Sequence, residues 1–383
     1  MGISARFGRC NQLQRPFPPG ARSCNRLQWA FRRVLVVATG CNGYFRTAKP
    51  VAGACCGFFR LKQLRAFIGK HCPRPLTTFT PELNHPRLMS DTTTAKTVEQ
   101  PEKSIDELKE IAAQVRRDIV RMVHAVNSGH PGGSLGITDL LVALYFKVMK
   151  HHPEPFDMDG KDQDLFFLSN GHISATMYSV LARSGYFPVS ELATFRKLNS
   201  RLQGHPTTHE GLPGVRVASG SLGQGLSVAC GAAQAKKMNG DKQRVFVLMG
   251  DGELEEGQNW EAALYASHHK IDNLVAIVDR NGQQIDGSTD DIGGLGDIGA
   301  KFKAFGWQVF EGDGNHFDAL LPTLENCVAA TGKAKPILFV MDTKMGFGVD
   351  FMMDGHKWHG IAPNDKQLAE ALDQLKVGTN ADY

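Results

Sequence analysis

The chain contains 383 residues and carries a formal net charge of +4 at neutral pH, a value that by itself suggests a weak affinity for anions. This charge is divided very unevenly, because residues 1–88 hold 15 Lys and Arg but only one acidic residue. The remainder carries a net charge of −10, which excludes a generally basic body that would bind nucleic acid.

Residues 1–88 form a basic leader that we expect to be unstructured, since Pro, Gly and Cys are scattered through it without an amphipathic period. The favoured interpretation is upstream sequence translated from a misplaced start, with the natural start at Met89. The alternative is an organellar transit peptide, which has the same Arg-rich, acid-poor composition. Residues 89–103 are typical of a frayed, flexible N-terminus.

Cysteine use and hydropathy limit the compartment. Six of the eight cysteines lie in the leader, so the body needs no disulfide framework, and a reducing, cytoplasmic location is the simplest interpretation. The apolar run at 34–38 is far shorter than the roughly 20 residues of a membrane span. We therefore expect no membrane partner.

From Ser104 onward the hydrophobic pattern becomes regular, and a capping box at Ser104 starts a helix that should end near Asn127. Further helices are predicted at 138–148, 174–184, 226–237, 258–270, 296–305 and 316–332. Short apolar runs predict strands at 165–168, 245–249, 274–278, 307–310 and 337–341. Strands that alternate with helices predict a three-layer α/β fold with a mainly parallel sheet, and we take 104–383 as one domain.

The tripeptide Gly-Asp-Gly at 250–252 follows one predicted strand, and Asn281 follows the next. A helix-length segment joins the two strands, so both turns should lie at the carboxyl edge of one parallel sheet, where open α/β sheets bind ligands. Asp251 and Asn281 are then placed to converge on a hard cation, while Gly250 and Gly252 let the backbone approach a phosphate. This pattern predicts a site for a magnesium-bound diphosphate.

The same tripeptide occurs a second time, at 312–314. The residue 30 positions after Asp313 is Thr343, whereas the residue 30 positions after Asp251 is Asn281. Because no second polar ligand follows at the right spacing, we predict that this copy is a structural turn between a strand and a helix.

Four blocks of the sequence resemble the transketolase family and stand in that family's order. They are Asn-Ser-Gly-His-Pro-Gly-Gly at 127–133, Leu-Ser-Asn-Gly-His at 168–172, Gly-Ser-Leu-Gly-Gln-Gly at 220–225, and the acidic Gly-Asp-Gly region through Asp-Arg-Asn-Gly at 250–282. The resemblance covers about residues 104–370. It implies the thiamine-diphosphate-binding fold, thiamine diphosphate with Mg²⁺ (or Ca²⁺ or Mn²⁺) as cofactors, and transfer of a two-carbon ketol unit from a ketose phosphate to an aldose.

The resemblance also implies roles for individual residues. The metal would be held by Asp251, Asn281 and the main-chain carbonyl of Gln283. The cofactor would contact His172, Ser221, Leu222, Gly223, Gly250, Asp251, Gly252, Glu256 and Asn281. In the family the acid at position 256 belongs to a network between paired cofactor sites; from the residues alone it could equally be a solvated acid at the start of a helix.

Histidines recur next to glycines, and four of them are candidate site residues: His130, His172, His205 and His359. By resemblance, His172 lies beside the diphosphate and thiazolium, and the other three hydrogen-bond substrate hydroxyls or shuttle protons. Taken alone, any one of them could be a surface or core histidine, although imidazole is the side chain best suited to proton transfer near neutral pH.

One expected residue is absent. Thiamine chemistry in the resembling family needs a Glu on the pyrimidine ring, carried by a second domain that would follow the end of this chain. The chain therefore resembles the N-terminal, diphosphate-binding half of a split transketolase, which acts on sugar phosphates in an A₂B₂ heterotetramer with the catalytic Glu on the partner subunit. Two alternatives stay open: part of another split thiamine enzyme (2-oxoacid dehydrogenase alpha or deoxyxylulose-phosphate-synthase-like) and a non-catalytic cofactor-binding half. The sugar phosphates themselves are also left open.

Overall fold

The computed structural model describes residues 103–353, 355–376 and 382–383. The predictions for the basic leader and for nearly all of residues 89–103 lie outside the described residues. All described residues belong to one compact unit. Within these ranges, none of the helices is both long enough and apolar enough to cross a membrane.

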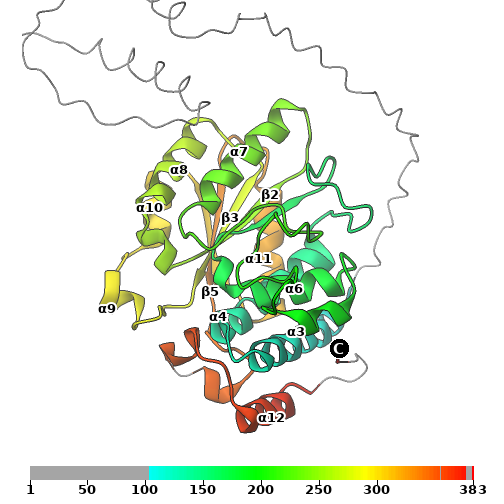
Figure 1. Ribbon diagram of the computed structural model, residues 1–383. Coiled ribbons are helices and arrows are strands. Elements are labelled where there is room, and N and C mark those ends of the chain that lie inside the picture. The colour runs from blue at the N-terminus through cyan, green and yellow to red at the C-terminus, as the bar shows by residue number, and fades with distance from the viewer. Residues whose placement is uncertain (1–102, 354, 377–381) are drawn as a thin grey trace, which may run out of the picture. The chain divides into compact units, whose positions relative to one another are not determined.

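A five-stranded sheet forms the centre of the described region, with the strand order β1-β2-β3-β5-β4. The strands are β1 Leu165–Leu168, β2 Val245–Gly250, β3 Leu274–Arg280, β4 Gln308–Asp313 and β5 Ile337–Asp342. All neighbouring pairs are parallel, and Gly250 at the end of β2 lies opposite Asp279 on β3. These strands therefore end at one common edge, and β2 and β3 end side by side in the interior of the sheet (Figure 1).

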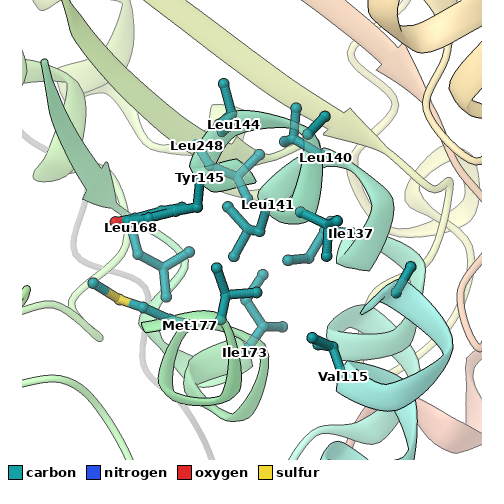
Figure 2. Close-up of a cluster of buried hydrophobic side chains, with 14 of the residues drawn as sticks. Val115, Ile137, Leu140, Leu141, Leu144, Tyr145, Leu168, Ile173, Met177 and Leu248 are labelled. Atoms are coloured by element: carbon teal, nitrogen blue, oxygen red, sulfur yellow. The ribbon is translucent and has the colours of Figure 1, made fainter. Parts of the chain in front are cut away.

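Strands β1, β2, β3 and β5 are buried on both faces, as their nearly continuous apolar sequences require, whereas the edge strand β4 is only partly buried. Alternate residues of β2 enter two separate cores: Phe246 and Leu248 face one, whereas Val245 and Val247 face the other. Figure 2 shows part of the first core, where leucine, isoleucine and valine side chains from the helices meet Leu248. This packing fixes the register of β2, because a slip by one residue would exchange the two faces.

Helices cover both faces (Figure 1). The first core is covered by α3 Ile105–Ala125, α4 Pro131–Gly136, α5 Thr138–Ala143, α6 Ser174–Arg183 and α11 Phe317–Ala329. The second is covered by α7 Gly225–Met238, α8 Gly257–His268 and α10 Ile298–Ala304. The short α9, Thr289–Gly293, buries none of its residues. The last helix, α12 Asp365–Gln374, packs against α3, where Arg117 donates hydrogen bonds to the carbonyls of Leu372 and Leu375.

The three-layer α/β fold predicted from the sequence is confirmed, and the capping box at Ser104 is present. Four segments differ from the expected elements. The helix expected at 138–148 changes to a π-helical turn at Leu144–Val148, and α9 and α12 were not predicted. No helix was predicted between residues 127 and 138, yet α4 forms there, since Pro131 at its first position presets a helical φ.

Candidate functional site

The carboxyl ends of β1, β2, β3 and β5 surround a cavity of about 240 Å³. Its walls contain residues from each of the four sequence blocks and from the loop before α12. They are His130, Gly133, Asn170, His172, Ile173, Leu222, Gly250, Asp251, Gly252, Glu253, Asp279, Asn281, Gln283, Gln284, Ile285, Met345 and His359. The fold therefore gathers most of the predicted site residues at one edge of the sheet.

Asp251 follows β2 directly and is only 4% exposed. Its Oδ1 accepts a hydrogen bond from the main-chain N–H of Gly252 at 2.8 Å. Its Oδ2 accepts another from the main-chain N–H of Gly282 at 2.7 Å, on the turn after β3. The carboxylate is thus held between the ends of two adjacent strands, as the right-handed connection between them predicts.

Asn281 is fixed in a similar way. Its side-chain N–H donates to a carboxylate oxygen of Asp279 at 2.8 Å, and its Oδ1 accepts from the main-chain N–H of Gln283 at 2.9 Å. Gln283 lines the same cavity and pairs with Ser288 in an antiparallel bridge that closes the turn. Asp251, Asn281 and Gln283 therefore lie together, and they offer carboxylate, amide and carbonyl oxygens.

Two carboxyl groups are buried beside one another here. Burial raises the pKa of Asp251 to about 6. It raises the pKa of Asp279 to about 7, and the neighbouring charge of Asp251 adds to that rise, although Thr343 donates a hydrogen bond to Asp279. Among the described residues, neither carboxylate forms an ion pair with a basic side chain. Two buried acids without a cation, next to amide and carbonyl oxygens, fit a divalent ion such as Mg²⁺, which prefers hard oxygen ligands.

Three of the four predicted histidines form a cluster in the lining of the same cavity. The ring centroids of His130 and His172 are 5.0 Å apart, and His359 lies 5.6 Å from the first and 5.2 Å from the second. Burial lowers the pKa of His130 to about 4 and that of His172 to about 3, with mutual repulsion among the histidines contributing. The rings are therefore neutral near pH 7. The Nδ1 atoms of His130 and His359 are buried without a hydrogen-bond partner, so they have free capacity toward a ligand.

His205 is the outer member of the predicted set. It is exposed, is not part of the lining of this cavity, and packs against Gly220, where an added Cβ would lie 2.8 Å from its ring. Partial burial, followed by the charge of Arg196, lowers its pKa. It also lies close enough to His130 and His172 to lower their pKa values, so it stands at the edge of the histidine cluster.

Of the three residues predicted from the 220–225 loop, only Leu222 lines the cavity. Ser221 is exposed. Gly223 has a φ of +82° and packs against Glu256, where a Cβ would lie 2.7 Å from the Glu256 Cβ. Glu256 is itself exposed and outside this cavity lining, so the structure does not bring it to the site within one chain.

The buried acid of this region is instead Glu253, which the sequence analysis missed. Its Oε1 accepts hydrogen bonds from the main-chain N–H of Gly223 at 2.8 Å and from the hydroxyl of Ser169, and its Oε2 accepts from the N–H of Gly250 at 3.1 Å. One carboxylate thus ties the ends of β1 and β2 to the 220–225 loop. Nothing in the sequence distinguishes it from the neighbouring exposed acids Glu255 and Glu256.

Two other lining residues were missed although a signal was present. Asp279 is an acid at the end of an otherwise apolar predicted strand, two positions before Asn281. Asn170 stands inside the block at 168–172, and its Oδ1 is buried without a partner. In both cases a polar side chain at a strand end, rather than the family pattern, could have indicated a ligand contact.

Comparison with known proteins defines the class that this fold and site represent. Residues 108–382 match the family model described as "Transketolase, thiamine diphosphate binding domain". The chain therefore belongs to the transketolase family, as its N-terminal, thiamine-diphosphate-binding part.

The chain is similar to several proteins that are themselves named as single subunits of transketolases. One is an apulose-4-phosphate transketolase subunit of Actinobacillus succinogenes, which is 39% identical over 274 residues, or 71% of this chain and 97% of the relative. Another is a 6-deoxy-6-sulfo-D-fructose transketolase subunit of a Clostridium species, which is 34% identical over 275 residues, or 72% and 98%.

Solved transketolases are similar over part of their length. The structure of the Campylobacter jejuni enzyme has a TM-score of 0.66 at 32% identity, and the match covers 71% of this chain and 43% of that one. The Leishmania mexicana enzyme has a TM-score of 0.65 at 32% identity, covering 72% and 42%. The chain therefore spans nearly the whole length of the single-subunit relatives but less than half of these longer enzymes.

Proposed function

We propose that this protein is the N-terminal, diphosphate-binding subunit of a split transketolase that transfers a two-carbon ketol group from a ketose phosphate to an aldose. The observation that carries the proposal is the cavity at the sheet edge. There, two buried carboxylates with raised pKa values line the same cavity as a cluster of neutral histidines. That arrangement suits a metal-bound diphosphate at one end and a sugar at the other.

Asp251, Asn281 and the carbonyl of Gln283 would hold Mg²⁺, and the N–H groups around Gly250 and Gly252 would face the diphosphate. When bound, thiamine diphosphate supplies a nucleophilic carbanion that also serves as an electron sink. Leu222 would contact the aminopyrimidine side. Ser221, Gly223 and Glu256 lie outside the lining of the cavity in a single chain, so we assign them to contacts completed in the assembly.

The histidines would act on the sugar. A neutral imidazole donates one hydrogen bond and accepts one, which matches a hydroxyl group. His172 would lie nearest the cofactor, whereas His130, His205 and His359 would orient sugar hydroxyls or move protons between them. Their lowered pKa values keep them in the neutral form at pH 7, where each can accept a proton from a hydroxyl that becomes acidic during the reaction.

We propose that the Glu required at the pyrimidine ring comes from a separate C-terminal subunit, and that the two kinds of chain form an A₂B₂ assembly in the cytoplasm. The near-complete match to relatives named as single transketolase subunits supports this assignment. Those relatives are named for different sugars, so the substrate would be a sugar phosphate whose identity is set largely by the partner.

The test is a ketol-transfer assay with the full chain, thiamine diphosphate, Mg²⁺, xylulose 5-phosphate and ribose 5-phosphate, with and without the chain that co-purifies with it. We expect turnover only in the presence of the partner. Turnover by the chain alone would contradict the split mechanism. Bound cofactor without turnover in either case would exclude xylulose 5-phosphate and ribose 5-phosphate as the substrate pair, and acyl transfer to a lipoyl domain would identify a 2-oxoacid dehydrogenase component instead.

A further inference from the structure

Arg196 lies on the loop that connects the 3₁₀ helix Val189–Thr194 to His205. Its φ is +54°, in the left-handed region that residues with a side chain rarely adopt. Its main-chain N–H donates to the carbonyl of Leu202 at 2.8 Å, which closes the loop. Because such a conformation persists only where its surroundings enforce it, the backbone of Arg196 is held in a defined conformation.

The guanidinium of Arg196 joins two segments that carry site histidines. One terminal nitrogen donates to the hydroxyl of Ser128 at 2.9 Å, two residues before His130. The other donates to the carbonyl of Gly204 at 3.2 Å, directly before His205. A single planar group therefore spans the two loops.

The segment that carries His172 also contacts Gly204. The carbonyl of Gly204 also accepts a hydrogen bond from the hydroxyl of Ser174 at 2.9 Å. Ser174 opens α6, two residues after His172. The Gly204 carbonyl thus accepts hydrogen bonds from both Arg196 and Ser174. A shift of the Arg196 guanidinium would therefore move Gly204 together with His205 and, through Ser174, the segment that carries His172.

The charge of Arg196 has no counter-ion among the described residues. The side chain is half-buried, burial lowers its pKa, and its Nε is buried without a hydrogen-bond partner. Arg201 on the same loop differs, since it forms a two-point ion pair with Glu191 at 2.8 and 2.7 Å. The guanidinium carbon also lies over the ring of Phe195, 5.4 Å from its centroid. A half-buried cation without a carboxylate partner is costly, so its placement calls for a role other than surface charge pairing.

We propose that Arg196 is a positioning residue of the sugar site, which acts through Ser128 and Gly204 to fix His130 and His205 relative to one another. The inference rests on the proposed function, because these histidines are there assigned to the sugar. Arginine suits the role better than lysine, since its rigid fork can donate in two directions at once. Its positive charge also opposes protonation of both rings.

The test compares Arg196→Met and Arg196→Lys with the control Arg201→Met in the full chain. With the partner subunit present, Arg196→Met should lower kcat/KM for the ketose phosphate by about 10- to 100-fold, the effect of a misplaced reacting group. The affinity for thiamine diphosphate with Mg²⁺ should change by less than about 3-fold, since the metal ligands lie outside these contacts. Arg196→Lys should not restore kcat/KM, and Arg201→Met should stay within about 3-fold of the unmodified chain.

Histidine NMR of the chain alone provides a readout that does not depend on turnover. Arg196→Met should raise the pKa of His205 and His130, because it removes a nearby positive charge. Arg196→Lys should leave those pKa values near their original level. If Arg196→Met does not fold, Ser128→Ala removes one of the two links and should lower kcat/KM by a smaller factor with the cofactor affinity intact.

Three results would overturn the inference. They are an Arg196→Met variant that is kinetically equal to Arg201→Met, a parallel loss of cofactor affinity that indicates general disruption, and unchanged histidine titrations. The first leaves the proposed function standing, because the unmodified protein still turns over. If the unmodified protein with its partner shows no ketol transfer, the proposed function fails instead, and the NMR titrations still decide whether Arg196 controls the histidines.

Discussion

The two copies of Gly-Asp-Gly have the same residues in the same local order, strand then turn then helix, yet their aspartates lie in opposite environments. Asp251 ends β2, in the interior of the sheet, and is 4% exposed, and burial raises its pKa to about 6. Asp313 ends the edge strand β4, and its side chain is 43% exposed. Its pKa is lowered: partial burial opposes this, but hydrogen bonds from Asn315 and His316 outweigh it.

The difference comes from what lies next to each turn. Beside Asp251 is the end of β3, with a second buried acid, Asp279, and the amide of Asn281. Asp313 instead accepts main-chain N–H bonds from Asn315 and His316 at 2.6 and 3.1 Å and pairs with the His316 ring at 2.7 Å, at the start of α11. The expected structural turn is found there. One motif therefore forms either part of a buried, acid-lined cavity or the start of a helix, depending on the neighbouring strand.

The largest expected effect comes from Asp251→Ala, which removes the carboxylate from the proposed metal site. Magnesium-dependent binding of thiamine diphosphate should fall by at least about 100-fold, because the cation loses its charged ligand. Asp313→Ala is the matched control and should leave the affinity within about 3-fold. Isothermal titration with and without Mg²⁺ measures both, and near-normal binding by Asp251→Ala would remove Asp251 from the metal site.

A smaller effect is expected from Thr343→Val, which keeps the shape of the side chain but removes the hydroxyl that donates to Asp279. Without that hydrogen bond the carboxylate is harder to ionise, so the affinity for Mg²⁺ should fall by about 10-fold. Thr323→Val on α11 also loses a hydroxyl hydrogen bond, to the carbonyl of Ala319, and serves as the control. Equal Mg²⁺ affinities for the two variants would mean that Asp279 does not support the metal.

The opposite pKa shifts predict opposite pH dependences for the metal-free chain. Asp251 is stabilising while protonated, so its contribution is present below about pH 4 and is lost as the pH rises through about 6. The unmodified chain loses this contribution as Asp251 ionises, whereas the Asn variant cannot ionise. The free energy of unfolding of Asp251→Asn, relative to that of the unmodified chain, should therefore rise across that window by up to roughly 3 kcal/mol. Asp313 has a lowered pKa, so its contribution is fully present above about pH 4 and is lost as the pH falls below that value. For Asp313→Asn the relative stability should therefore fall as the pH rises toward about 4 and stay level above it, by less than about 1 kcal/mol in total. Urea unfolding at several pH values checks both, and slopes of the same sign would refute the contrast.

The smallest effect is expected from the structural copy itself. Asp313→Ala removes the acceptor for the two N–H groups at the start of α11 and should lower the free energy of unfolding by about 1 kcal/mol. Thermal unfolding measures this as a fall in Tm of a few degrees, with the cofactor affinity unchanged. A loss of cofactor binding in this variant would show that the second copy also belongs to the functional site.

Much of the fold was predictable because its signals are local. The apolar runs that became β2 and β3 are too short and too uniformly apolar for anything but strands buried on both faces, and the capping residues of α3 are readable directly. The short α4 was not predictable from propensity, since three of its six residues are glycine. It is held by close packing: a Cβ on Gly132 would lie 2.5 Å from Met345, which is more than 200 positions away in the chain.

The residues of the site likewise divide into those that the sequence could predict and those that it could not. From the sequence, Asp251 and Asn281 could be predicted to lie close together. A right-handed crossover between adjacent parallel strands places the carboxyl ends of both strands side by side at the same edge of the sheet. Which acid of the stretch 253–256 is buried could not be read, since that depends on where the 220–225 loop and the end of β1 pack. The structure selects Glu253 and leaves Glu256 exposed. Nor does any local pattern mark Arg196, whose two partners lie in separate loops.

The sequence by itself thus determined the class of the protein, the strand ends that line the cavity and the identity of most polar groups there. These follow from the order of the strands along the chain and from the spacing of apolar residues within each element. Both can be read directly from the sequence. Only the tertiary structure decided how deeply each Gly-Asp-Gly aspartate is buried, which glutamate is enclosed and which hydrogen bonds join the loops that carry the histidines. Burial and hydrogen-bond partners set these properties, and both depend on segments that are distant in the chain.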